Sequence, residues 1–260
     1  MRPLASWQAG QIIGVFTDID DTLTTQGAIT PDARQALADL KTAGLRVIPV
    51  TGRPVGWSEP FAQSWPVDAL VAENGAVALL HSEGQPLRKL YQQDLATRLS
   101  NFKRMQQVLA RIEREVPGAR RAQDSPGRET DIAIDHSEFT HLPPEAIEAV
   151  LRLMQAEGMN ASVSSIHING WYGAHDKLAG ARWIVREHLG RELDTELDSW
   201  VYVGDSTNDQ VMFKHFPCSV GVANIRRFEA QLSHPPRYIT QAERGAGFAE
   251  LVAHLLKEMP

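Results

Sequence analysis

The first third of the chain alternates short apolar runs with an amphipathic segment. The runs QIIGVFT (11–17), LRVIPVT (45–51) and VDALVAENG (67–75) are typical of buried strands, and AVALLH (76–81) follows closely enough to turn back beside the third. The segment TPDARQALADLKTAG (30–44) predicts a helix with Thr30 as its N-cap, proline in the first turn and Gly44 at its end. Strands joined in this way indicate a parallel sheet with crossover helices.

The pattern changes between about residues 82 and 169. Apolar residues recur at steps of three or four from residue 95 to residue 116, which predicts one long amphipathic helix: Leu95, Leu99, Phe102, Met105, Leu109, Ile112 and Val116. A polar loop, a strand TDIAID (130–135), a helix LPPEAIEAVLRLMQAEG (142–158) and a strand NASVSSIHI (160–168) follow. These elements predict a small α+β unit inserted at 83–169.

The α/β alternation then resumes. The sequence predicts helices at 176–190, 206–216 and 246–256, and strands at 199–205, 218–223 and 236–240. We therefore expect an α/β protein with a Rossmann-like parallel sheet. Its core would comprise residues 1–82 and 170–260, and the insertion would form a cap.

Composition narrows the functional classes. Of 260 residues, 43% are hydrophobic and 22% charged, as in ordinary globular proteins, and the net charge of −6 argues against a nucleic-acid partner. Cys218 is the single cysteine, and no apolar run reaches the ~20 residues of a membrane span. The first residues lack the apolar core of a signal peptide. We expect a cytoplasmic protein without membrane contact, either monomer or homodimer.

Polar clusters follow several of the predicted strands. They are DID (18–20), TGR (51–53), ENG (73–75) and GDSTND (204–209). Each cluster alone is compatible with a solvated turn. Because ligands bind at the carboxyl ends of parallel strands, four such clusters at one edge predict a site. Asp18, Asp20 and Asp21 repel one another, so either a cation lies between them or the turn is simply well solvated.

These motifs resemble those of one known family. DIDDT (18–22), TGR, Lys177 at a helix start and GDSTND occur in the order of the four motifs of the haloacid dehalogenase (HAD) phosphohydrolase superfamily. The position of the insertion resembles the C2-capped members. ENG is similar to the subgroup, subfamily IIB, that includes Cof-like proteins and the phosphatases of sucrose phosphate and mannosyl-3-phosphoglycerate.

The resemblance implies a role for each motif residue. Asp18 corresponds to the nucleophile that forms an aspartyl-phosphate, and Asp20 to the general acid and base. A carboxylate at Asp20 favours phosphoryl transfer over dehalogenation. The implied ligands of Mg²⁺ are the side chains of Asp18, Asp205 and Asp209 and the backbone carbonyl of Asp20. The implied phosphate-binding residues are Thr51, Gly52, Lys177 and Asn208.

The sequence alone does not decide which residues select the substrate. Arg53, Arg128, His167 and Asn169 are candidates for substrate contact, although a structural polar role suits His167 and Asn169 equally well. The cap residues Arg120, Arg121 and Arg128 either lie in a solvated loop, or one of them binds a second anionic group of the substrate. Asp21 fits a turn residue better than a ligand.

Together these features predict a Mg²⁺-dependent phosphatase that acts on a small phosphorylated metabolite, a sugar phosphate. One alternative is a sugar phosphomutase of the same superfamily, because the same aspartyl-phosphate can be passed to a sugar hydroxyl. The other is a non-catalytic sugar-phosphate-binding protein with the same fold.

Overall fold

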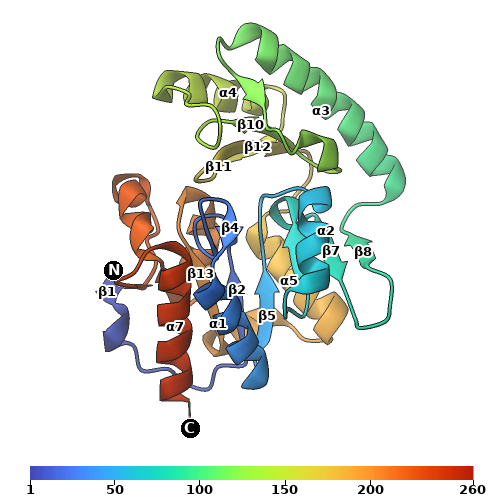
Figure 1. Ribbon diagram of the computed structural model, residues 1–260. Helices are drawn as coiled ribbons and strands as arrows, with labels where there is room; N and C mark the ends of the chain where they lie inside the picture. Colours follow the sequence, from blue (N-terminus) through green and yellow to red (C-terminus); the bar gives the residue numbers. More distant parts are fainter. Residues whose placement is uncertain (260) are drawn as a thin grey trace.

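The computed structural model describes residues 1–259. Its main element is a six-stranded parallel sheet with the order β1-β15-β14-β13-β2-β5 (Figure 1). The strands in this order are Arg2–Pro3, Tyr238–Ile239, Cys218–Gly221, Trp200–Gly204, Gly14–Thr17 and Arg46–Pro49. Gly14 is required beside β13, since a Cβ there would lie 2.4 Å from the Trp200 ring. The expected α/β fold with a parallel sheet is confirmed.

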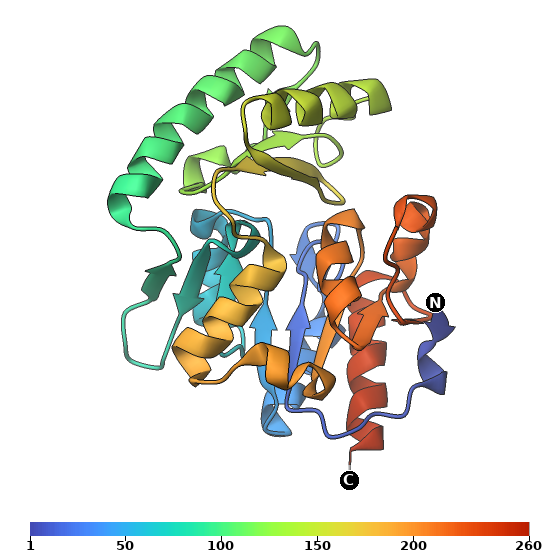
Figure 2. The same cartoon turned by 180° about the vertical axis from the view of Figure 1, so that it is seen from behind.

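Helices cover both faces of this sheet. On one face lie α1 (Pro31–Thr42), α2 (Val55–Ser64) and α7 (Arg244–Glu258); on the other lie α5 (Lys177–Leu189) and α6 (Gln210–His215) (Figures 1 and 2). Each layer buries its own apolar cluster against the sheet. The predicted N-cap Thr30 precedes α1, but its side chain makes no capping hydrogen bond; Asp32 Oδ1 instead accepts one from the backbone N–H of Ala33 at 2.9 Å.

Two elements beside the sheet were not expected from the sequence. Pro60 lies inside α2, and a proline inside a helical segment obscures the helix pattern. A short hairpin of β3 (Thr24–Thr25) and β4 (Ala28–Ile29) follows the aspartate loop.

The predicted turn-back after the third strand is confirmed. There β6 (Leu70–Ala72), β7 (Val77–Leu80) and β8 (Arg88–Tyr91) form an antiparallel sheet.

A second α+β unit lies over the carboxyl ends of the parallel strands (Figures 1 and 2). Its antiparallel sheet has the order β11-β12-β10-β9, with strands Asn160–Val163, His167–Trp171, Ile132–Asp135 and Arg120–Arg121. Helices α3 (Leu95–Glu115) and α4 (Pro144–Ala156) pack on it around a separate apolar cluster. We call this unit the cap. The exact residues that divide core from cap stay a prediction.

The cap differs from the expectation in two respects. The predicted strand 160–168 is a hairpin, because Ser164 Oγ accepts hydrogen bonds from the backbone N–H groups of Ile166 and His167 and so turns the chain. The apolar stripe of α3 is buried only from Met105 onward. Leu99 is 64% exposed, because the first turns of α3 extend past the cap sheet (Figure 1). Among residues 1–259, no helix has the length and apolarity to cross a membrane.

Candidate active site

Three buried carboxylates meet where β2 and β13 end. These strands are neighbours in register, and the Asp18 backbone N–H donates to the Val203 carbonyl at 2.9 Å. Asp18 directly follows β2, whereas Asp205 directly follows β13. One carboxylate oxygen from each of Asp18, Asp205 and Asp209 lies within 4.8 Å of the others. The sheet thus brings together Asp18 and Asp205, which lie 187 positions apart in the sequence.

Lys177 is the cation that this acidic group contacts. As the first residue of α5 it is buried, and its Nζ lies 2.5 Å from Asp18 Oδ1 and 2.7 Å from Asp209 Oδ1. Burial lowers the pKa of Lys177, but the two carboxylates outweigh burial and raise that pKa overall. Burial raises the pKa of Asp18 to about 7 even though Lys177 opposes the shift. A single lysine therefore does not compensate the buried negative charge.

Asp209 and Asp205 differ in how much of each carboxylate is free. Asp209 Oδ1 accepts hydrogen bonds from Lys177 and from the Tyr202 hydroxyl, and Oδ2 accepts from the backbone N–H groups of Asp205 and Ser206. These four donors fill the acceptor sites of one carboxylate. Asp205 Oδ1, in contrast, is buried and has no hydrogen-bond partner within residues 1–259. An oxygen-preferring cation such as Mg²⁺ fits this donor set, with Asp205 as its freest ligand.

The expected phosphate-binding residues lie in the loops beside Asp18. Thr51 follows β5 and is buried, and its Oγ1 accepts the backbone N–H of Arg53 at 3.0 Å. Gly52 has little room for a side chain, since a Cβ there would lie 3.2 Å from Asn74 Oδ1. The Asn208 side chain accepts a hydrogen bond from Ser206 Oγ at 2.9 Å. Its expected contact with Lys177 or phosphate stays a prediction.

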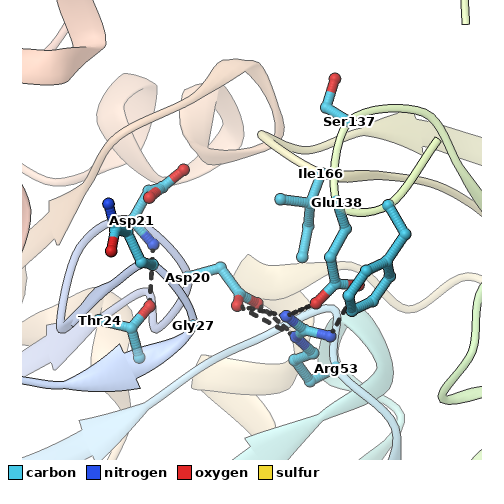
Figure 3. A pocket seen from close by; sticks show the side chains of 10 residues that line it. Asp20, Asp21, Thr24, Gly27, Arg53, Ser137, Glu138 and Ile166 are labelled. Carbon is cyan, nitrogen blue, oxygen red and sulfur yellow. Dashed lines mark hydrogen bonds and ion pairs between the residues drawn. The ribbon is translucent and has the colours of Figure 1, made fainter. Parts of the chain in front are cut away.

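Asp20 is paired with Arg53 and lines a cavity together with cap residues. The Arg53 guanidinium donates to both oxygens of Asp20 at 2.9–3.0 Å and to Glu138 of the cap (Figure 3). It also donates to Asp124 of the cap at 3.2 Å. His167 Nε2 lies 2.8 Å from Glu138 Oε2. Two of the candidate specificity residues, Arg53 and His167, therefore belong to one network of ion pairs and hydrogen bonds that joins core and cap.

The other two candidates, Arg128 and Asn169, lie in a second buried network. Arg128 donates to Asp131 at 2.7 Å and to the Gly52 carbonyl at 3.0 Å. Asn169 donates to Asp131 at 2.9 Å and to the same carbonyl at 3.3 Å. Nearby, the buried carboxylate of Glu73 accepts hydrogen bonds from the backbone N–H groups of cap residues 129 and 130. These contacts fix the cap against the loops that follow β5 and β6.

Part of the chain matches the sequence model of a known protein family. Residues 15–117 match the family model of haloacid dehalogenase-like hydrolases, a segment that begins in β2 and contains the first two motifs. Over this segment the chain is similar to haloacid dehalogenase-like hydrolases. The resemblance expected from the motifs is confirmed. A comparison with curated protein sequences gives no match.

Solved structures share the fold of this chain over nearly its whole length. A Thermoplasma acidophilum protein superposes with a TM-score of 0.70 at 17% identity, covering 96% of this chain and 100% of its own. The sucrose-phosphatase of Synechocystis sp. PCC6803 gives 0.65 at 16% identity, covering 98% of both chains. A sugar phosphatase of HAD subclass IIB gives 0.62 at 16% identity, covering 95% of this chain and 99% of its own.

Sequence reasoning missed several polar residues of the candidate site. Asn224 follows β14 and donates to Asp205 Oδ2 at 3.1 Å, and Tyr202 lies within β13. The cap contributes Asp124 and Glu138. Only Asn224 carried a signal in the sequence, since it stands at a strand end like the four recognised clusters. Tyr202 lies inside an apolar strand, and Asp124 and Glu138 lie in cap loops, so no sequence pattern distinguished them.

Proposed function

We propose that this hydrolase is a phosphatase that removes the phosphoryl group from a small phosphorylated metabolite, a sugar phosphate, through an aspartyl-phosphate on Asp18. The observation that carries the proposal is the buried group of Asp18, Lys177 and Asp205, with the Asp20 carboxylate two residues further along facing the cap. The sucrose-phosphatase and sugar-phosphatase structures that share the fold support the choice of a sugar phosphate.

Asp18 and Asp20 have different roles in the proposed reaction. An Asp18 oxygen attacks phosphorus, the bond from phosphorus to the leaving oxygen breaks, and Asp20 gives its proton to that oxygen. Asp20 then takes a proton from water, whose oxygen attacks phosphorus and releases phosphate and the free Asp18 carboxylate. Lys177 would stabilise the phosphoryl oxygens as a point charge, and Thr51 and the Gly52 N–H would donate hydrogen bonds to them.

The acidic residues of the site need a cation for this reaction. Because burial raises the pKa of Asp18 to about 7, its nucleophilic carboxylate form requires positive charge nearby. When bound, Mg²⁺ supplies that charge and polarises the phosphoryl group. Asp18 and Asp205 would hold it, together with the Asp20 backbone carbonyl. Asp209 has its acceptor sites filled and would orient Lys177 and the loop after β13.

The test is hydrolysis of p-nitrophenyl phosphate and of a sugar phosphate panel, with Mg²⁺ or with EDTA. We expect Mg²⁺-dependent phosphate release, and a loss of about 10³-fold or more in Asp18→Asn. The matched control is Asp194→Asn, an exposed aspartate paired with Arg182. Activity that survives Asp18→Asn would contradict the mechanism. Accumulation of an isomeric sugar phosphate without inorganic phosphate would indicate a mutase, and binding without turnover a non-catalytic protein.

A further inference from the structure

A cavity of about 530 Å³ lies between core and cap beside Asp20. The core contributes the aspartate loop and the β3–β4 hairpin, and the cap contributes the 137–139 loop and Ile166 (Figure 3). We call it the leaving-group cavity, since Asp20 lines it and would protonate the leaving oxygen. Its charged lining residues are Asp20, Asp21, Arg53 and Glu138.

Arg53 is the one cation in that lining, and all of its donors are in use. A guanidinium has five N–H groups. Nε donates to Asp20, Nη1 to Asp124 and Glu138, and Nη2 to Asp20 and Glu138. The remaining lining acid, Asp21, is paired with Arg244, with 2.8 Å between Nε and Oδ1. The cavity therefore carries net negative charge and offers no free cation to a second anionic group.

Glu138 is held rigidly at the cap side of this cavity. The buried Asp135 carboxylate accepts hydrogen bonds from four successive backbone N–H groups, those of residues 137–140. His167 Nε2 also contacts the Glu138 carboxylate, at 2.8 Å from Oε2. Burial would raise the pKa of Glu138, but hydrogen bonds from His167 and Arg53 outweigh it and lower that pKa to about 2. Glu138 thus presents a preorganised, ionised carboxylate opposite Asp20.

We propose that Glu138 determines the specificity of the leaving-group cavity, which accepts neutral, hydroxyl-bearing leaving groups and rejects those with a second negative charge. The inference rests on the proposed phosphatase function. Carboxylates accept hydrogen bonds from hydroxyl groups, whereas a carboxylate or phosphate placed beside Glu138 and Asp20 would be repelled. Such repulsion of the wrong ligand is an effective source of specificity.

The cap arginines do not offset this charge. Arg121 is paired with Glu113 at 2.6 Å on the outer part of the cap, and Arg128 is buried against Asp131. Arg120 donates to the Ala119 carbonyl at 2.9 Å. None of the three lines the leaving-group cavity among the residues described. The hypothesis that these arginines read a second anion receives no support from their positions.

The test compares sorbitol 6-phosphate with 6-phosphogluconate, two linear six-carbon phosphates that differ in a terminal CH₂OH or carboxylate. We expect wild-type kcat/KM to favour the sorbitol ester by about tenfold or more. Glu138→Gln should reduce this ratio by about fivefold or more, chiefly by raising kcat/KM for the gluconate ester. The control is Glu113→Gln, another cap glutamate in an arginine pair, which should keep the wild-type ratio.

The outcomes separate this inference from the proposed function. A wild-type enzyme that hydrolyses both esters equally or prefers the gluconate ester overturns the role of Glu138 while leaving the phosphatase function intact. An unchanged ratio in Glu138→Gln does the same, and a purely structural defect would lower both rates together. If neither ester nor p-nitrophenyl phosphate is hydrolysed, the phosphatase function itself fails. The wild-type comparison needs no variant to fold.

Discussion

Asp18, Asp20 and Asp21 lie within four residues of one another, yet each has a different partner. Asp18 is buried beside Lys177, Asp20 is paired with Arg53, and Asp21 has a positive φ of 54° and pairs with Arg244. The motif resemblance assigned the three acids different roles, but the sequence did not reveal their partners. Their environments differ because the three partners come from distant parts of the chain, which local sequence cannot reveal.

The Tyr202 hydroxyl provides a test of how Asp209 acts. If Asp209 positions Lys177 and the loop of Asp205 rather than binding the metal directly, removing one of its four donors should loosen the site. We expect Tyr202→Phe to weaken Mg²⁺ binding by about 10- to 100-fold, measured by calorimetric titration and by the Mg²⁺ dependence of turnover. Tyr91→Phe, which removes a hydroxyl bonded to Glu129 outside the site, is the control. Unchanged affinity in Tyr202→Phe would contradict this role.

At the scale of elements, the contact of α5 with the 73–75 turn decides where Lys177 lies. A Cβ at Gly180 would approach the Gly75 Cα to 2.5 Å, so both glycines permit this close approach. Gly75 also has a φ of +106°, which disfavours a side chain. The first turn of α5 can therefore lie against the turn and direct Lys177 toward Asp18.

Gly180→Ala should separate α5 from the turn and move the Lys177 ammonium away from Asp18. We expect kcat/KM for p-nitrophenyl phosphate to fall by about 10- to 100-fold, since small displacements of catalytic groups are costly. Arg182→Ala, on the exposed side of the same helix, should leave the kinetics close to wild type. Wild-type kinetics in Gly180→Ala would show that this close approach does not position Lys177.

The elements that sequence reasoning placed correctly are those with a strong local pattern. The first helix, the long cap helix and the buried parallel strands all follow the expected periodicity. Helix α2 was missed because Pro60 interrupts its pattern, and the β11–β12 hairpin because its turn lies within one predicted strand. Periodicity also cannot tell that the first turns of α3 lie beyond the cap sheet, where Leu99 remains exposed.

At the scale of the whole molecule, several groups of contacts join cap and core. They include the Arg53–Glu138 pair, the network of Arg128 and Glu73, and a hydrogen bond of 2.8 Å from Thr207 Oγ1 to the Val163 carbonyl. The last contact reaches the loop that carries Asp205 and Asp209. The position of the cap is therefore coupled to the geometry of the candidate active site through contacts on several sides of the cavity.

His175 lies in the connection from β12 to α5 and makes folding stability depend on pH. It stacks on Trp171, its Nε2 is buried without a partner within residues 1–259, and burial lowers its pKa to about 4. Between the ordinary value of 6.5 and about 4, the unfolded chain binds the proton more readily. Stability therefore falls as pH decreases through this range, by about 3 kcal/mol from this group.

His175→Gln should flatten that dependence. We expect the free energy of unfolding of the variant to decrease less than that of wild type between pH 7 and pH 4.5, measured by urea denaturation. The buried amide can lower stability at every pH, so the slope with pH is the readout. His141→Gln, at an exposed cap histidine, should keep the wild-type slope. Equal slopes in His175→Gln and wild type would contradict the assignment.

The sequence by itself determined the fold class, the resemblance to a known family and the candidate motif residues. It could do so because apolar periodicity encodes the elements and because parallel strands carry their functional residues at one edge. Tertiary structure decided the rest. Lys177 meets Asp18 across 159 positions and Arg53 meets Glu138 across 85. Which acid is buried, paired or facing the cavity depends on such distant contacts, and a linear pattern does not contain them.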